Sequence, residues 1–296
     1  MTFSEKKETL TKRIEEVLIT YLPKADGPQE KLLEAMRYSV NAGGKRLRPM
    51  LMLSSFELFG GKDRSVEPFL AAMEMIHTYS LVHDDLPAMD NDDFRRGKPT
   101  THKAFGEAAA ILCGDALLNF SMETACLSFS LAPENPNIPK ALSVLYQRSG
   151  IFGMIGGQAV DVETDSGRPV DRETLDFIYR LKTGALIEGA CTVGAVLAGA
   201  PEKDLAVLQK AAKAAGMAFQ IRDDILDVEG TFETLGKPVG SDARNQKATF
   251  VTLEGLDAAR QKVEELTKEA ALAFDSIQGD TAFLKELILS LAKRNS

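Results

Sequence analysis

The chain has 296 residues, of which 44% are hydrophobic, and its formal net charge is -8. This apolar content is enough for a sizeable buried core, which excludes a largely disordered chain. The acidic balance argues against a nucleic-acid partner, because nucleic-acid-binding domains carry an excess of positive charge. An acidic protein that binds an anionic substrate needs cations to neutralise its carboxylates locally, and divalent metal ions can do this.

The predicted elements are helices from one end of the chain to the other. Residues 66–76 place apolar side chains at i, i+3, i+4 and i+7, and residues 205–219 do nearly the same. Residues 184–200 are rich in glycine and alanine and include Glu188, which predicts a close-packed interior helix rather than a membrane span. Alternating, strand-like runs are missing. The sequence therefore predicts a single all-α domain over residues 1–296, with about ten helices packed as a bundle.

The cysteines and the N-terminal residues indicate a cellular compartment. Cys113, Cys126 and Cys191 are far apart and match no metal-ligand spacing, so free thiols in a reducing cytosol are favoured over disulfides. Residues 1–16 are charged and lack the apolar core of a signal peptide. We therefore expect a soluble, cytoplasmic protein without membrane insertion.

A first cluster of aspartates follows the helix predicted around residues 66–76. Five aspartates stand within residues 84–93, and they would repel one another unless they were neutralised. On a helix, His77 and Asp84 lie on nearly the same face, about two turns apart. Pro87 breaks or kinks that helix, so Asp90 can return toward Asp84. A solvated acidic loop is the alternative, but aspartates are unfavourable at a helix C-terminus. The spacing favours carboxylates that converge on a bound ion.

A second cluster forms one polar stripe on a later helix. Gln220, Asp223, Asp224 and Asp227 stand at i, i+3, i+4 and i+7. Taken alone, this could be an ordinary solvent-facing acidic stripe. Carboxylate oxygens suit Mg²⁺, which often shares phosphate oxygens of a substrate. Two such clusters facing each other would hold a diphosphate through Mg²⁺ bridges and stabilise it as it departs.

Basic residues supply a second, metal-independent anion site. Lys45, Arg46 and Arg48 directly follow a pair of glycines, which let backbone approach a ligand closely. Arginine binds phosphate oxygens in a bidentate manner, and Arg95 and Arg96 add two more guanidinium groups. A solvated surface turn is the alternative. An ordinary surface or structural role is the competing interpretation for three isolated residues, Lys182, Lys237 and His77.

Together these motifs resemble the short-chain trans-prenyltransferases of the polyprenyl synthase family, and among them the bacterial (2E,6E)-farnesyl diphosphate synthases. The resemblance runs from Gly43 to about Phe250. It implies the isoprenoid synthase fold, an all-α bundle of ten or more helices around a deep central substrate cavity. The motifs that carry it are Gly43-Gly44-Lys45-Arg46-x-Arg48-Pro49, Asp84-Asp85-x4-Asp90 with Arg95-Arg96-Gly97, Gly114-Asp115, Gly157-Gln158-x-x-Asp161, Lys182-Thr183, Phe219-Gln220-x-x-Asp223-Asp224-x-x-Asp227 and Gly236-Lys237.

The resemblance also implies a role for each motif. The expected ligands of Mg²⁺, for which Mn²⁺ can substitute, are Asp84, Asp85, Asp90, Asp223, Asp224 and Asp227. The residues expected to act on the allylic substrate are Arg95, Lys182, Thr183, Gln220 and Lys237. The residues expected to bind isopentenyl diphosphate are Lys45, Arg48, His77 and Arg96. A homodimer is expected from the family alone. Residues 230–245 depart somewhat from the family pattern.

The implied reaction joins isopentenyl diphosphate to dimethylallyl and geranyl diphosphate, giving farnesyl diphosphate by ionisation, condensation and elimination. No protein nucleophile is required, in keeping with the lack of a Ser-His or Cys-His signature. Tyr79 lies about one and a half helical turns before Asp84, and with Ser80 it is expected to limit the product to fifteen carbons. Ordinary core packing is the alternative role for Tyr79.

Three other functions compete with this one. A geranyl or geranylgeranyl diphosphate synthase would use the same chemistry and differ in product size. A terpene cyclase usually replaces the second aspartate cluster with an Asn/Ser/Glu motif, whereas Asp223, Asp224 and Asp227 are all present. A non-catalytic partner subunit typically loses one cluster, and here both are intact.

Overall fold

A computed structural model describes residues 1–165, 169–229 and 248–292. The chain divides into two compact units. The N-terminal unit comprises residues 1–53 and 61–142, and the C-terminal unit comprises residues 54–60 and 143–296. The single domain expected over residues 1–296 stays a prediction.

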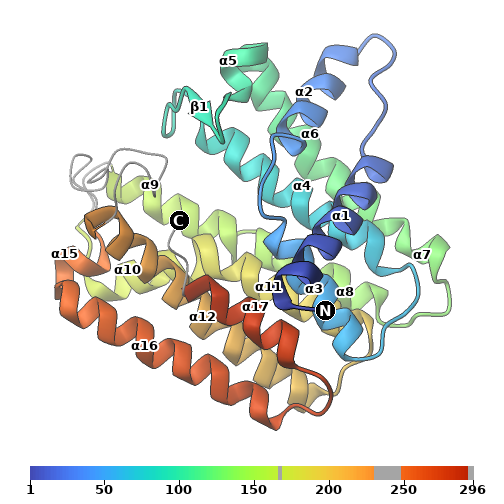
Figure 1. The fold of residues 1–296 in the computed structure, drawn as a ribbon. Helices are drawn as coiled ribbons and strands as arrows, with labels where there is room; N and C mark the ends of the chain where they lie inside the picture. The colour runs from blue at the N-terminus through green and yellow to red at the C-terminus, as the bar shows by residue number, and fades with distance from the viewer. Residues whose placement is uncertain (166–168, 230–247, 293–296) are drawn as a thin grey trace. The chain divides into compact units, whose positions relative to one another are not determined.

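Helices make up almost all the regular structure of the described residues, which confirms the all-α class (Figure 1). Up to residue 149 the elements are α1 (Phe3–Tyr21), α2 (Glu30–Val40), α3 (Leu47–Leu58), α4 (Val66–Asp84), β1 (Phe94–Arg95), β2 (Lys98–Pro99), α5 (Thr101–Phe105), α6 (Glu107–Cys126), α7 (Ser128–Leu131) and α8 (Ile138–Ser149). After it come α9 (Met154–Asp165), α10 (Arg172–Ile178), the π-helix η1 (Tyr179–Gly184), α11 (Ala185–Leu197), α12 (Glu202–Glu229), α15 (Phe250–Glu254), α16 (Leu256–Ala273), the 3-10 helix η2 (Phe274–Ser276) and α17 (Ala282–Ala292).

The N-terminal unit is built around α4, which packs against α6 and also contacts α1 and α2. The apolar residues predicted to share a helix face, among them Phe69, Leu70 and Met73, are fully buried. Every residue of α4 from Pro68 to Ile76 is buried, so packing on all sides holds the helix that ends at Asp84.

The C-terminal unit is built around α11 and α12. Every residue of α11 is buried, which confirms the interior helix predicted for this stretch. Helix α12 packs against α11, α16 and α17, and α16 runs beside it (Figure 1). A Cβ atom on Gly216 of α12 would lie 3.1 Å from the Cα atom of Gly184, so glycine at this position lets α12 approach the π-helix η1 closely.

Two further features concern α6 and the cysteines. By length and composition alone, Glu107–Leu131 could cross a membrane, with 39% of its most apolar window buried. A single such helix is weak support for a membrane protein, since core helices of soluble proteins pass the same test. All three cysteines are free, as expected: Cys113 and Cys191 are buried and Cys126 is exposed.

Candidate active site

The first aspartate cluster lies at the C-terminal end of α4, where the chain folds back on itself. The helix ends at Asp84, three residues before Pro87. The backbone amide of Asp90 then donates a hydrogen bond to the carbonyl oxygen of Asp84 over 2.8 Å. The return of Asp90 toward Asp84 that the sequence predicted is therefore present at the level of the backbone.

Asp85 and Arg95 form a bidentate ion pair within this cluster. Arg95 extends from the short β1–β2 hairpin, which the sequence did not predict, and its Nε and Nη2 atoms lie 2.5–2.9 Å from the Asp85 oxygens. Burial raises the pKa of Asp85 above its usual value, although Arg95 acts to lower it. Arg95, which is expected to act on the allylic substrate, is thus paired with Asp85, which is expected to bind metal.

Arg46 anchors the basic loop before α3, a role that sequence reasoning missed. Its side chain is buried and pairs with the buried Glu74 of α4, with 2.7 Å between Nη1 and Oε1. Its Nη2 atom also donates to the carbonyl oxygen of Val40 over 2.9 Å. Arg46 has a φ of 47°, in the left-handed region, so these contacts hold a strained turn between Lys45 and Arg48. The sequence signal that could have predicted this contact was Glu74, a charged residue inside the apolar run of α4.

Arg48 and Arg96 create a local excess of positive charge near that anchor, and the neutral His77 lies close enough to feel it. The Arg48 Nε atom is buried and has no hydrogen-bond partner among the described residues. Burial lowers the pKa of Arg48 to about 10, and the charge of Arg96 contributes. Burial also lowers the pKa of His77 well below its usual value, with further contributions from Arg48 and Arg96. A cluster of this kind is suited to bind an anion, as the sequence predicted for these three residues.

The glycine pair Gly43 and Gly44 lies next to Arg96. The Arg96 Nη1 atom donates to the carbonyl oxygen of Gly43. A Cβ atom on Gly44 would lie 2.6 Å from the same Nη1 atom, so a larger residue would displace the guanidinium group. Lys45, the fourth residue expected at this site, is exposed.

Tyr79 is buried one and a half turns before the end of α4. Its hydroxyl group has no hydrogen-bond partner among the described residues. Burial, with the nearby charge of Asp84, raises the pKa of Tyr79 to about 12. Its ring contacts His83 edge-on, and the neighbouring Ser80 hydroxyl donates to the carbonyl oxygen of His77 over 2.9 Å. The chain-length role of Tyr79 and Ser80 stays a prediction.

The Gly114 motif has a packing role that the sequence did not reveal. His83 lies against α6, with its Nε2 atom 3.1 Å from the carbonyl oxygen of Ile111. A Cβ atom on Gly114 would lie 2.0 Å from the same Nε2 atom. Glycine at this position therefore gives His83, and with it the end of α4, room to pack.

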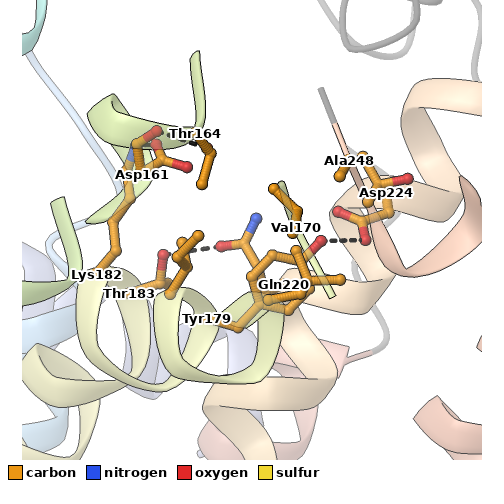
Figure 2. A pocket seen from close by; sticks show the side chains of 12 residues that line it. Asp161, Thr164, Val170, Tyr179, Lys182, Thr183, Gln220, Asp224 and Ala248 are labelled. Carbon is orange, nitrogen blue, oxygen red and sulfur yellow. Dashed lines mark hydrogen bonds and ion pairs between the residues drawn. The ribbon is translucent and has the colours of Figure 1, made fainter. Parts of the chain in front are cut away.

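A second group of expected site residues surrounds a pocket of about 150 Å³ in the C-terminal unit (Figure 2). The π-helix η1 supplies Lys182 and Thr183, and π-helical turns are frequent at functional sites. Thr183 donates through Oγ1 to the Oε1 atom of Gln220 over 2.8 Å, so η1 and α12 are joined by two residues expected to act on the same substrate.

Asp161 of α9 pairs with Lys182 in this pocket. Sequence reasoning noted Asp161 in a motif with Gly157 and gave it no role. The structure explains the motif, because a Cβ atom on Gly157 would lie 2.2 Å from the backbone nitrogen of Lys182. Glycine lets α9 approach η1 so closely that Asp161 reaches the lysine.

The second aspartate cluster lies in the last two turns of α12. Asp224 and Asp227 are buried and Asp223 is half-buried. The Oδ2 atom of Asp224 accepts hydrogen bonds from the Tyr179 hydroxyl and from the backbone nitrogen of Phe250, at 2.5 and 2.8 Å. Lys237, the remaining expected site residue, lies outside the described residues, as do residues 230–245.

Residues 29–280 match the model of the family described as Polyprenyl synthetase. The chain belongs to this family. It is 43% identical over 286 residues to the farnesyl diphosphate synthase of Bacillus subtilis, covering 96% of this chain and 95% of that protein. It is 44% identical over 262 residues to the geranylgeranyl diphosphate synthase of Cyanophora paradoxa, covering 87% and 85%.

A solved structure of the same kind extends the likeness to the fold. The geranyltransferase from Helicobacter pylori, solved with magnesium and isoprenyl diphosphate, has a TM-score of 0.84 and 32% identity, covering 99% of this chain and 97% of that one. The isoprenoid synthase fold expected from the sequence motifs of this polyprenyl synthetase is thereby confirmed.

Each aspartate cluster of this polyprenyl synthetase offers carboxylate oxygens, which are the donors that Mg²⁺ prefers. Mg²⁺ binds few protein carboxylates and completes its coordination with water and phosphate oxygens. No group of three or more His, Cys, Asp or Glu side chains within residues 1–165, 169–229 and 248–292 is arranged as a metal centre. The assignment of the six aspartates as magnesium ligands stays a prediction.

Proposed function

We propose that this polyprenyl synthetase condenses isopentenyl diphosphate with dimethylallyl and geranyl diphosphate to give farnesyl diphosphate. The observation that carries the proposal is the buried Nε atom of Arg48, near His77 and Arg96, which has no hydrogen-bond partner among the described residues. A diphosphate would supply the acceptor oxygens that this cluster lacks. The B. subtilis relative, which carries the name of this activity, matches over nearly the whole chain.

Different side chains bind the two substrates in this proposal. Lys45, Arg48, His77 and Arg96 bind isopentenyl diphosphate. Asp84, Asp85, Asp90, Asp223, Asp224 and Asp227 are the residues that would hold Mg²⁺, or Mn²⁺ in its place, and the bound metal would supply positive charge to neutralise the departing allylic diphosphate. Arg95, Lys182 and Lys237 bind the same diphosphate directly.

Bond changes in this reaction require no protein nucleophile. The carbon–oxygen bond of the allylic diphosphate breaks, and the double bond of isopentenyl diphosphate attacks the resulting allylic cation. A proton then leaves the condensed product for the released diphosphate. The oxygens of Thr183 and Gln220, which are joined by a hydrogen bond, stabilise the cation by their dipoles. Exclusion of water matters because water would quench the cation.

Lys182 exchanges partners during this cycle. Without substrate, its ammonium group forms an ion pair with the Asp161 carboxylate. A diphosphate group carries more negative charge than one carboxylate and offers more acceptor oxygens, so it competes for the ammonium group. Asp161 then serves to hold Lys182 at the pocket before the allylic substrate arrives.

The test is a product assay with isopentenyl diphosphate, Mg²⁺ and either dimethylallyl or geranyl diphosphate. Identification of the dephosphorylated products by mass should give mainly a fifteen-carbon alcohol. A twenty-carbon alcohol would support the alternative, a geranylgeranyl diphosphate synthase, which the C. paradoxa relative favours, and a ten-carbon alcohol would indicate a geranyl diphosphate synthase. Absence of condensation in the folded protein would contradict the proposal and leave a terpene cyclase or a non-catalytic subunit.

Tyr79 provides a sharper prediction about product length. If its buried ring closes the end of the product cavity, Tyr79→Ala should shift the main product from fifteen to twenty carbons or more. Tyr79→Phe should leave the product unchanged, because the hydroxyl group has no hydrogen-bond partner among the described residues to lose. Ser80→Ala tests the other residue expected to limit the product, and an unchanged product from Tyr79→Ala would assign the ring to core packing.

The protein is proposed to work as a cytoplasmic homodimer whose single domain spans residues 1–296. The family supports this assembly, and α6 offers a surface for it, since Ile111, Leu112 and Met122 are exposed on that helix. A second copy on this surface would cover the apolar side chains that make residues 107–131 resemble a membrane helix.

A further inference from the structure

A buried hydrogen bond beside the second aspartate cluster has no role in the function proposed above. Tyr179 is the first residue of η1, three residues before Lys182, and only 6% of it is exposed. Its hydroxyl group donates to the Oδ2 atom of Asp224 over 2.5 Å (Figure 2). Asp224 is itself 4% exposed, and a buried carboxylate is costly unless hydrogen bonds satisfy it.

The same carboxylate oxygen also holds the start of α15. The backbone nitrogen of Phe250 lies 2.8 Å from Oδ2 of Asp224 and 3.3 Å from the Tyr179 hydroxyl oxygen. Phe250 is the first residue of α15, and the preceding Thr249 caps that helix through its hydroxyl group. Asp224 is therefore the point at which three elements, η1, α12 and α15, are joined by hydrogen bonds.

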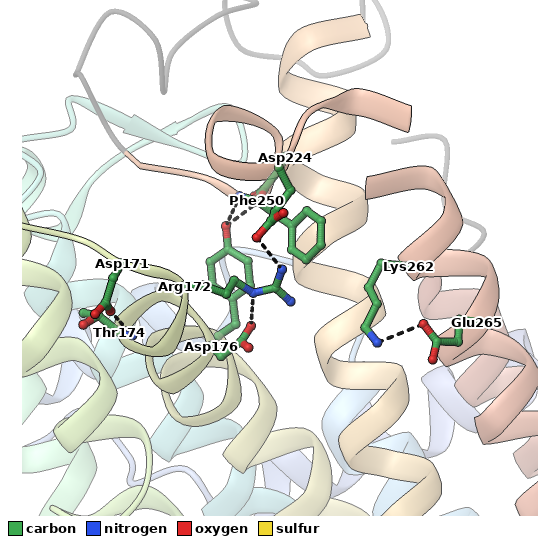
Figure 3. A network of polar contacts seen from close by, with 10 residues as sticks. Asp171, Arg172, Thr174, Asp176, Asp224, Phe250, Lys262 and Glu265 are labelled. Carbon is green, nitrogen blue, oxygen red and sulfur yellow. Dashed lines mark hydrogen bonds and ion pairs between the residues drawn. The ribbon is translucent and has the colours of Figure 1, made fainter. Parts of the chain in front are cut away.

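Phe250 is also fixed from its other side, as Figure 3 shows. The Arg172 guanidinium group lies 4.0 Å from the centre of the Phe250 ring. Arg172 is in turn held by Asp176 at 2.9 Å and by Glu254 at 3.4 Å. Because these contacts restrict the backbone at Phe250, the donor that it presents to Asp224 has little freedom to move.

We propose that Tyr179 is a positioning residue that orients Asp224 for diphosphate and Mg²⁺ binding at the second aspartate cluster. The inference rests on the proposed function. Asp224 lines the same pocket as Tyr179, Thr183 and Gln220. Hydrogen bonds from surrounding groups orient carboxylates that bind metals, and their removal typically weakens metal binding about 10- to 100-fold. Tyr179 thus acts through Asp224 and touches neither the metal nor the reacting atoms.

The experiment follows thermal unfolding of the wild type and of Tyr179→Phe while Mg²⁺ is titrated at a fixed concentration of inorganic diphosphate. Ligands that bind the folded state raise the melting temperature, so the titration reports binding without turnover. We expect Tyr179→Phe to need about ten times more Mg²⁺ than the wild type to reach half of the full rise in melting temperature. Tyr21→Phe is the matched control, because it removes a hydroxyl group that contacts Glu67 at 3.5 Å, and its midpoint should stay within about twofold of the wild type.

Asp224→Asn provides the second variant and decides whether the hydroxyl group acts through this carboxylate. In an Asp224→Asn background, Tyr179→Phe should cause little further change, because coupled residues show non-additive effects. Additive effects, or a Tyr179→Phe midpoint within about twofold of the wild type, would overturn the proposal, as would a wild type that Mg²⁺ and diphosphate fail to stabilise. Failure of the condensation activity is a separate result, since it would appear in the product assay and not in this titration.

Discussion

His77 shows what the arginine cluster does to one side chain. Burial, together with Arg48, Arg96 and the other nearby arginines, lowers the pKa of His77 well below its usual value, so the folded protein keeps this imidazole neutral. The unfolded chain takes up a proton as the pH falls below about 6.5, and the folded chain does not. This one group should therefore reduce stability as the pH falls from about 6.5 toward the folded pKa, by at most about 1.4 kcal/mol per pH unit. The melting temperature of substrate-free protein, compared for wild type and His77→Gln between about pH 7 and about pH 5, should fall less in the variant. If the melting temperatures of the two proteins fell equally with pH, His77 would be protonated in the folded state.

At the scale of single elements, the contact between α9 and η1 places Lys182. A Cβ atom on Gly157 would lie 2.2 Å from the Lys182 backbone nitrogen, and a backbone atom cannot move aside as a flexible side chain can. Gly157→Ala should therefore push the two elements apart and lower the stability of the protein by about 1–3 kcal/mol, as overpacking does. Thermal unfolding would measure this against Ala159→Ser, an exposed substitution on the same helix. If Gly157→Ala had the same melting temperature as the control, η1 could shift without loss of stability.

The elements also show how far sequence reasoning reaches. Helices α4 and α11 could be predicted because their burial follows from apolar spacing and composition within one segment. The bond from Arg46 to Glu74 spans 28 residues and that from Tyr179 to Asp224 spans 45, and no local pattern specifies such partners. The β1–β2 hairpin and the π-helix were not predicted from the sequence because each is only a few residues long. The motifs predicted the site residues, but only the structure explained the packing roles of Gly114 and Gly157.

For the whole molecule, the exposed face of α6 makes association with a second copy testable. Leu112 of α6 is 56% exposed and, with the exposed Ile111 and Met122, belongs to a group of apolar side chains on one helix, and such groups commonly mark an interface. If two copies meet on this face, Leu112→Glu would bury two charges without partners, which costs several kcal/mol per ion. Light scattering should then give twice the chain mass for the wild type and the mass of a single chain for the variant. Leu272→Glu, on α16, changes a side chain that is 59% exposed and should leave the dimer intact. A wild type that is already monomeric would contradict the proposed dimer, and a dimer that survives Leu112→Glu would place its interface on another surface.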